Sequence, residues 1–227
     1  MVLCLALAFL LGATAEPLSA SELNAQGYRL YREGAYARAV EAFEAAISRD
    51  PRHALAHYNL ACTLGVLRKK GKTCEYDAVR ERILEHLQIA VELDPGHRKK
   101  MRNDPDFDAV RDTVAYQRLC GLSLARPRDR LRILQAVTWY GPAQGAYGPM
   151  QGARFHRDGT VSWWFLELVD DGVRRHALKG KYRLEGRRLR LEFEDQRSLE
   201  GRMTDNGSID FGERHLPLVD DPGECDA

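Results

Sequence analysis

Hydrophobic positions recur with two different periods along this chain, and the period changes near residue 125. Over residues 20–122, apolar side chains recur every three or four positions, which is typical of amphipathic helices. Beyond residue 130, short runs rich in aromatic and β-branched residues follow a period of two, which is typical of strands. The pattern therefore predicts an α+β fold with two domains, a helical domain followed by an antiparallel β domain.

Two helices are expected at the start of the helical domain. The first spans about residues 21–33 and stops at Gly34, because a residue without a Cβ atom lets the chain turn. The second spans about residues 36–49 and ends before Pro51, because the residue that precedes a proline avoids the helical conformation.

Turn signals that contain glycine separate the strand-like runs, at residues 157–159, 170–172, 185–186 and 205–207. Consecutive hairpins of this kind predict an antiparallel meander of about seven strands over residues 131–217. Closure of a sheet removes its exposed edges, so we expect a small barrel or a strongly curled sheet. Residues 123–130 are predicted to form the linker, and residues 218–227 a tail.

The first predicted helical hairpin carries a spaced set of small, aromatic and proline residues. The set comprises Gly27, Leu30, Gly34, Tyr36, Ala39, Phe43, Ala46 and Pro51. Its spacing resembles the tetratricopeptide repeat, a helix-turn-helix unit of about 34 residues. The resemblance extends over about residues 20–121, and it implies paired antiparallel helices that bind another polypeptide in a concave groove.

A second copy of this pattern begins at Ala54 and ends at Pro95. Pro51 and Pro95 are 44 residues apart, so this unit is about ten residues longer than the repeat. The insertion, RKKGKTCEYD or nearby, is expected to lengthen the turn between the two helices. Because two repeats cannot bury both of their open ends, residues 97–122 are expected to form a terminal capping helix.

The resemblance implies six groove residues when the family positions are carried over one at a time: Asn24, Tyr28, Tyr31, Arg32, Tyr58 and Asn59. Aromatic faces are frequent anchors in interfaces, and a guanidinium group can hold a carboxylate through two parallel hydrogen bonds. In the alternative interpretation, Tyr28 and Tyr58 pack against the insertion or the β domain. The resemblance thus predicts an adaptor module whose partner is another protein or peptide.

The β domain allows a second functional interpretation. Its segment GKYRLEGRRLRL resembles lipocalin-like meanders. The alternative function is therefore a barrel that binds a small apolar ligand, with the helices as an accessory domain. No G-x-S-x-G, phosphate-loop or H-E-x-x-H motif occurs in the sequence, so we expect no enzymatic activity, cofactor or metal site.

Charge and targeting signals restrict the partners further. A net charge of +1 gives no broad positive electrostatic field that would attract nucleic acid, so we do not expect nucleic acid to bind.

The apolar run over residues 1–15 is too short to span a bilayer, and it ends in Ala13-Thr14-Ala15. We predict a signal peptide cleaved near Ala15 and a periplasmic or secreted protein. A short buried N-terminal helix is the alternative.

Four cysteines follow the predicted signal peptide: Cys62, Cys74, Cys120 and Cys225. An oxidising compartment favours disulfide bonds, and four cysteines allow three connectivities. One of these joins Cys62 to Cys74 and Cys120 to Cys225. In the alternative, Cys62 is a small buried side chain and the other cysteines are free.

Overall fold

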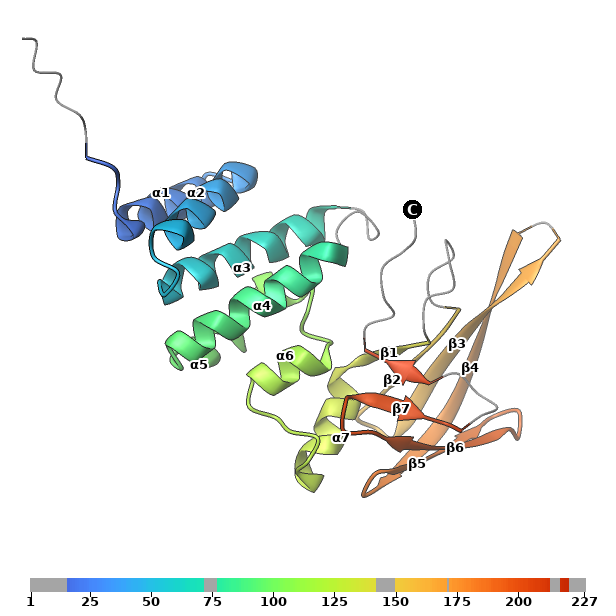
Figure 1. Ribbon diagram of the computed structural model, residues 1–227. Coiled ribbons are helices and arrows are strands. Elements are labelled where there is room, and N and C mark those ends of the chain that lie inside the picture. Colours follow the sequence, from blue (N-terminus) through green and yellow to red (C-terminus); the bar gives the residue numbers. More distant parts are fainter. Residues whose placement is uncertain (1–15, 72–76, 142–149, 171, 213–216, 221–227) are drawn as a thin grey trace, which may run out of the picture.

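The computed structural model of this protein describes residues 16–71, 77–141, 150–170, 172–212 and 217–220. Within these residues, helices form the N-terminal half and a closed antiparallel barrel forms the C-terminal half (Figure 1). The predicted α+β class is confirmed, and the sheet is a barrel. None of the helices described has the length and apolar character that crossing a membrane requires. The predicted signal peptide, Cys74 and Cys225 lie outside the described residues.

The first helical hairpin consists of α1 (Ala20–Arg32) and α2 (Tyr36–Arg49). The chain turns between them at Gly34, whose φ of 77° is easily adopted by glycine. A Cβ atom on Gly27 would lie 2.6 Å from the Phe43 ring. The missing side chain therefore lets α1 pack closely on α2.

The second hairpin consists of α3 (Ala54–Lys70) and α4 (Asp77–Leu93). α3 extends through residues 68–70 of the predicted insertion, residues 68–77. Residues 72–76 of the insertion lie outside the described residues. Both hairpins share one hydrophobic core, in which Phe43, Leu60 and Leu87 are fully buried. The helices lie where the hydrophobic pattern predicts them, whereas membership of the repeat family stays a prediction.

The segment expected to contain the capping helix, residues 97–122, forms three short elements in the structure. The chain there forms α5 (His97–Met101), a 3₁₀ turn η2 (Pro105–Phe107) and α6 (Val114–Leu119). A proline lacks the amide that a continuing helix needs, so Pro105 separates α5 from the segments that follow. Phe107 is fully buried in the helical core, so this irregular segment still covers the end of the second hairpin.

A further helix, α7 (Pro127–Ala136), occupies the second half of the predicted linker and the first six residues of the first predicted strand. Both predictions are wrong over these residues. Short apolar runs do not distinguish a strand from a buried helix, and a proline in the first turn favours the helix. Ile133 and Leu134 of α7 are fully buried against the barrel, which explains why the segment is not a free linker.

Eight antiparallel strands close the barrel in chain order within the described residues. They are β1 (Thr138–Tyr140), β2 (Gln151–Phe155), β3 (Thr160–Val169), β4 (Gly172–Glu185), β5 (Arg188–Phe193), β6 (Ser198–Met203), β7 (Ser208–Asp210) and β8 (Leu218–Val219). The predicted meander of about seven strands lacks β8, which is only two residues long and lies in the predicted tail. β8 pairs with β7 on one side and β1 on the other, and so closes the sheet.

α6 belongs to both halves of the molecule. Its Val114 packs in the barrel core, and the Val114 amide donates a hydrogen bond to the Asp220 carboxylate at 2.6 Å. Tyr116, two residues later, is buried in the helical core. Its hydroxyl donates to the Met101 carbonyl at 2.5 Å. The helical hairpins and the barrel are therefore joined by shared packing as well as by the chain.

A pair of histidines lies between α3 and α4. The Nδ1 atoms of His57 and His86 are 3.0 Å apart, and His57 is 3% exposed. Burial, followed by the neighbouring His57 and then Arg82, lowers the pKa of His86, whereas Glu85 and Glu44 act in the opposite direction. His86 therefore stays neutral in the folded protein at pH values where the unfolded chain takes up a proton.

We expect acidification to destabilise the protein through His86. The stabilisation is present above the unfolded pKa of about 6.5 and is lost as the pH falls through the lower folded value. A His86→Gln variant should lose less unfolding free energy than the wild type between about pH 7.5 and pH 5, as measured by urea denaturation. An equal loss in wild type and His86→Gln would contradict the assignment.

Candidate functional site

The predicted peptide-binding groove is occupied by the protein's own chain. The Tyr31 hydroxyl donates to the Asp106 carboxylate at 2.5 Å, and the Tyr58 hydroxyl donates to the Asp104 carboxylate at 2.9 Å. η2, which carries Asp106, lies so close to α3 that a Cβ atom on Gly65 would overlap the Asp106 carbonyl oxygen. The η2 segment thus covers the two hairpins at these tyrosines.

The other predicted groove residues divide into two pairs. Asn59 Nδ2 donates to Asn24 Oδ1 at 2.9 Å and so links α3 to α1, and Asn24 is itself buried. Tyr28 and Arg32 stay on the surface, with Tyr28 50% exposed. A cavity of about 220 Å³ remains next to the tyrosines. Four of the six residues therefore hold the protein's own helices and η2 together.

Potential metal ligands meet in the same place. The Cys62 sulfur and the carboxylate oxygens of Asp104 and Asp106 lie within 4.8 Å of one another, the one such group of three among the described residues. Both carboxylates already accept tyrosine hydroxyls, and burial raises the pKa of Asp106. Burial also raises the pKa of the Cys62 thiol, which donates weakly to Asp104 at 3.7 Å. The hydrogen bonds of Asp104 and Asp106 with the two tyrosines and Cys62 therefore close the predicted groove at this point.

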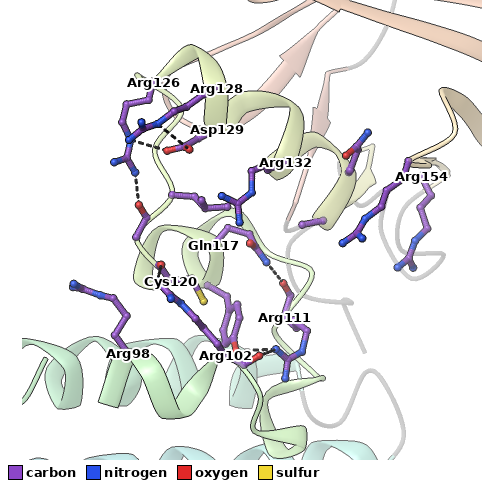
Figure 2. Close-up of a pocket in the computed structure, with 16 residues that line it drawn as sticks. Arg98, Arg102, Arg111, Gln117, Cys120, Arg126, Arg128, Asp129, Arg132 and Arg154 are labelled. Carbon is purple, nitrogen blue, oxygen red and sulfur yellow. Dashed lines mark hydrogen bonds and ion pairs between the residues drawn. The ribbon is translucent and has the colours of Figure 1, made fainter. Parts of the chain in front are cut away.

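A larger cleft, of about 1040 Å³, lies between the helical half and the barrel. Residues of α5, α6, α7 and β2 line it, and many of its side chains are arginines (Figure 2). The arginines are Arg98, Arg102, Arg111, Arg126, Arg128, Arg132, Arg154 and Arg157. We refer to it as the arginine cleft. Because the whole chain has a net charge of only +1, this concentration of positive charge is local.

Asp129 is the acidic side chain among the residues that line the cleft, and it is already paired. Its carboxylate lies 2.6 Å from Arg126 Nε and 3.9 Å from Arg128 Nε. It also accepts a hydrogen bond from the Ser123 amide at 3.0 Å and is 3% exposed. Asp129 thus fixes the start of α7 and offers no charge to the more distant arginines.

Three of the arginines are tied to the C-terminal end of α6. They donate to three consecutive backbone carbonyls, those of residues 119–121. Arg98 Nε bonds the first at 2.9 Å, Arg102 Nη2 bonds the second at 2.7 Å, and Arg126 Nη2 bonds the third. Carbonyls at a helix C-terminus lack intrahelical partners and favour nearby cations, which explains the arrangement.

The opposite wall carries arginines without such ties. Arg132 of α7, Arg154 of β2 and Arg157 after β2 are all exposed. No hydrogen bond or ion pair joins the side chains of these three to any other residue that the structure describes. Their charges repel one another across a cleft that has little negative charge of its own, and an entering anion would relieve this repulsion.

Sequence reasoning missed the arginine cleft. Its residues are scattered over residues 98–157, and they come together only when α7 and β2 fold back onto α5 and α6. Two segments are dense in basic residues, RKKMR at residues 98–102 and ARPRDRLR at residues 125–132. The second, where the pattern predicts a linker and the start of a strand, forms the first part of α7 and the residues before it.

The described cysteines lie at two different sites. Cys62 is buried beside the closed groove, and Cys120 lines the arginine cleft. Both are free thiols within the described part of the chain. Cys74 and Cys225, the partners expected for them, lie outside it, so the disulfide pairing stays a prediction.

The closed groove gives a direct test of the tyrosine roles. Tyr58→Phe should lower the free energy of unfolding by about 1–3 kcal/mol, because it removes the buried hydroxyl that donates to the Asp104 carboxylate, which keeps only its bonds from the Asp106 amide and the Cys62 thiol. Tyr28→Phe is the matched control and should change it by less than about 0.5 kcal/mol, since Tyr28 is half exposed. Urea denaturation measures both values. Equal small effects would show that the Tyr58 hydroxyl has no structural role.

No protein-family model matches the sequence, and no curated protein is significantly similar to it. Interpretation of the site therefore rests on its geometry and charge.

Proposed function

We propose that this chain is an exported interaction protein that binds an acidic segment of another polypeptide in the arginine cleft. The observation that supports it most is that eight arginines line one cleft, while the acidic partners near them are Asp129, which pairs with Arg126, and Asp108, which pairs with Arg111. A guanidinium group matches a carboxylate through two parallel hydrogen bonds, so side chains of Glu and Asp are suitable ligands. In this proposal the helical hairpins serve as the scaffold for one wall.

The dimensions of the cleft favour a chain segment over an enclosed small molecule. Its volume of about 1040 Å³ is at the upper end of small-molecule sites, which enclose most of the surface of their ligand. Arg132, Arg154 and Arg157 are exposed along one side, so the cleft is open to solvent there. An extended acidic segment can lie along it and place several carboxylates among the arginines.

Nucleic acid suits the cleft less well. Single strands bind through aromatic side chains on which bases stack, together with a positively charged groove. The aromatic residue lining this cleft is Tyr116, which is 1% exposed and offers no free face. The net charge of +1 also provides no extended positive field beyond the cleft.

The tyrosine groove has a smaller part in this proposal. Tyr31 and Tyr58 already bind the carboxylates of Asp106 and Asp104, so a peptide would have to displace the η2 segment to reach them. Tyr28 is available on the surface without such a change. The proposed function is therefore polypeptide binding with the arginine cleft as the main site.

Charge reversal in the cleft tests the proposal. We expect the double variant Arg132→Glu, Arg154→Glu to raise the Kd for a fluorescent peptide of alternating Glu and Gly at least about tenfold, measured by fluorescence anisotropy. The matched control is Arg38→Glu, Arg52→Glu, which makes the same charge change on exposed residues of the helical hairpins. Equal weakening by both variants, or tighter binding of a single-stranded oligonucleotide of equal charge, would overturn the proposal.

A second candidate function is supported by the barrel mouth. One half of the barrel is filled, since Trp139, Leu189 and Ile209 are fully buried. At the other end, an opening of about 420 Å³ remains. Its lining residues are Gln151, Trp163, Phe165, Leu178, Phe193, Arg197, Ser198 and Leu199. The apolar lining with a few polar groups suits a small apolar ligand.

A hydrophobic dye tests the second candidate. N-phenyl-1-naphthylamine should bind the wild type saturably, with a rise in dye fluorescence and a change in emission from Trp163. Leu199→Glu should abolish the signal, because it places a charge in the apolar opening. Leu168→Glu is the control on β3, where Leu168 is 57% exposed outside the opening, and it should leave the signal intact. A wild type without saturable binding would exclude this function.

A further inference from the structure

Arg98 and Arg102 combine two properties within the arginine cleft. Their guanidinium groups are held in place by backbone carbonyls, and neither meets an acidic side chain among the described residues. Starting from the binding function proposed above, we infer that these two arginines form a subsite for a phosphate monoester carried by a phosphorylated acidic segment.

The two side chains converge on one turn of the chain. Arg98 lies in α5 and Arg102 is its C-terminal cap residue, so a spacing of four places both on the same face. A Cβ atom on Gly121 would lie 3.9 Å from Arg102 Nη2 and 4.0 Å from Arg98 Cδ. These distances are those of ordinary van der Waals contact, so both arginines lie beside Gly121, whose φ of 92° favours glycine at this turn. Figure 2 shows Arg102 next to Cys120 of this turn.

The charge of this subsite matches a dianion. The guanidinium groups of Arg98 and Arg102, each held by one of two consecutive carbonyls, carry two positive charges, and these carbonyls carry only partial negative charge. A phosphate monoester carries a charge of about −1.5 to −2 near pH 7 and has three strong acceptor oxygens. A carboxylate carries half of that charge. The phosphate group therefore balances the pair better than a single Glu or Asp.

Enough donors remain for such a ligand. A guanidinium group has five N–H donors, and the bonds to the turn use one from Arg98 and one from Arg102. These same bonds occupy the carbonyls that would otherwise repel an anion at the end of α6. Because the groups are already fixed, less side-chain entropy is lost when the ligand binds.

The remaining arginines have different roles. Arg126 donates to the third carbonyl of the turn, that of Gly121. Its guanidinium group, however, is already paired with the Asp129 carboxylate, with Nε 2.6 Å from the oxygen. Arg132 and Arg154 on the opposite wall are exposed and untied, which suits attraction of the acidic flanks of the segment rather than recognition of one group. The cleft thus has a fixed side for the phosphate and an adaptable side for carboxylates.

Three matched peptides test this inference. Each has Glu and Gly on both sides of one central residue, which is serine, phosphoserine or aspartate. Fluorescence anisotropy at constant ionic strength should give the wild type a Kd for the phosphoserine peptide about tenfold lower than for the serine peptide. The aspartate peptide should have a Kd between those of the other two, because its carboxylate carries about half of the charge of the phosphate group. A wild type with no preference for phosphoserine would overturn the inference.

Substitutions of the cleft arginines test whether Arg98 and Arg102 cause the preference for phosphoserine. Arg98→Gln, Arg102→Gln should bring the ratio of the two Kd values close to one while unphosphorylated binding persists. The matched double variant Arg132→Gln, Arg154→Gln should weaken both peptides and keep the ratio. Arg98→Lys, Arg102→Lys retains the charge and should also reduce the ratio, so a misfolded glutamine variant does not prevent the test. An unchanged ratio in folded variants of Arg98 and Arg102 would overturn the inference.

Competition separates the two sources of phosphate. Inorganic phosphate should displace the phosphoserine peptide only at concentrations about a hundredfold above that of the unlabelled peptide, since the acidic flanks contribute to binding. Equal potency would assign the subsite to free phosphate and overturn the peptide assignment. Loss of the preference with retained acidic-peptide binding refutes only this inference, whereas loss of all binding that depends on the cleft refutes the proposed function as well.

Discussion

The packing of α6 between two hydrophobic cores is the constraint on which the rest of the structure depends. Val114 contributes to the barrel core and Tyr116 to the helical core, although only one residue separates them in sequence. A six-residue helix has little stability of its own, so these contacts, with the Val114 amide bonded to Asp220, hold it in place. The position of α6 fixes the turn over residues 119–121, and that turn carries one wall of the arginine cleft.

The distribution of charge follows from this geometry. A chain with nearly balanced charge places eight arginines around one cleft and a single acidic side chain among them. Arg98 and Arg102 satisfy the unpaired carbonyls at the end of α6, and this requirement of helix termini explains why they lie there. The same bonds leave most of their donors directed elsewhere. The hydrogen bonding of backbone carbonyls at the end of α6 thus produces a cationic surface that an anion can bind.

The tyrosine groove shows the opposite outcome. Tyr31 and Tyr58 have the character expected of peptide anchors, yet their hydroxyls bind Asp106 and Asp104 of the same chain. Irregular structure after α5 makes this possible, because a straight capping helix would not bring two carboxylates into the groove. The residues that resemble a binding surface therefore stabilise the fold, and the open surface lies where arginines from distant segments meet.

The sequence by itself determined the helices up to Leu93, the hairpin turns and the alternation of the strands, because these depend on spacing and on residues such as Gly34 and Gly186. It did not determine α7, since an apolar run of this length fits a helix or a strand, or β8, which is too short to leave a pattern. Only the tertiary structure decided which arginines share a cleft and that the groove is closed. The physical reason is that periodicity records local burial, whereas a site depends on contacts between segments far apart in sequence.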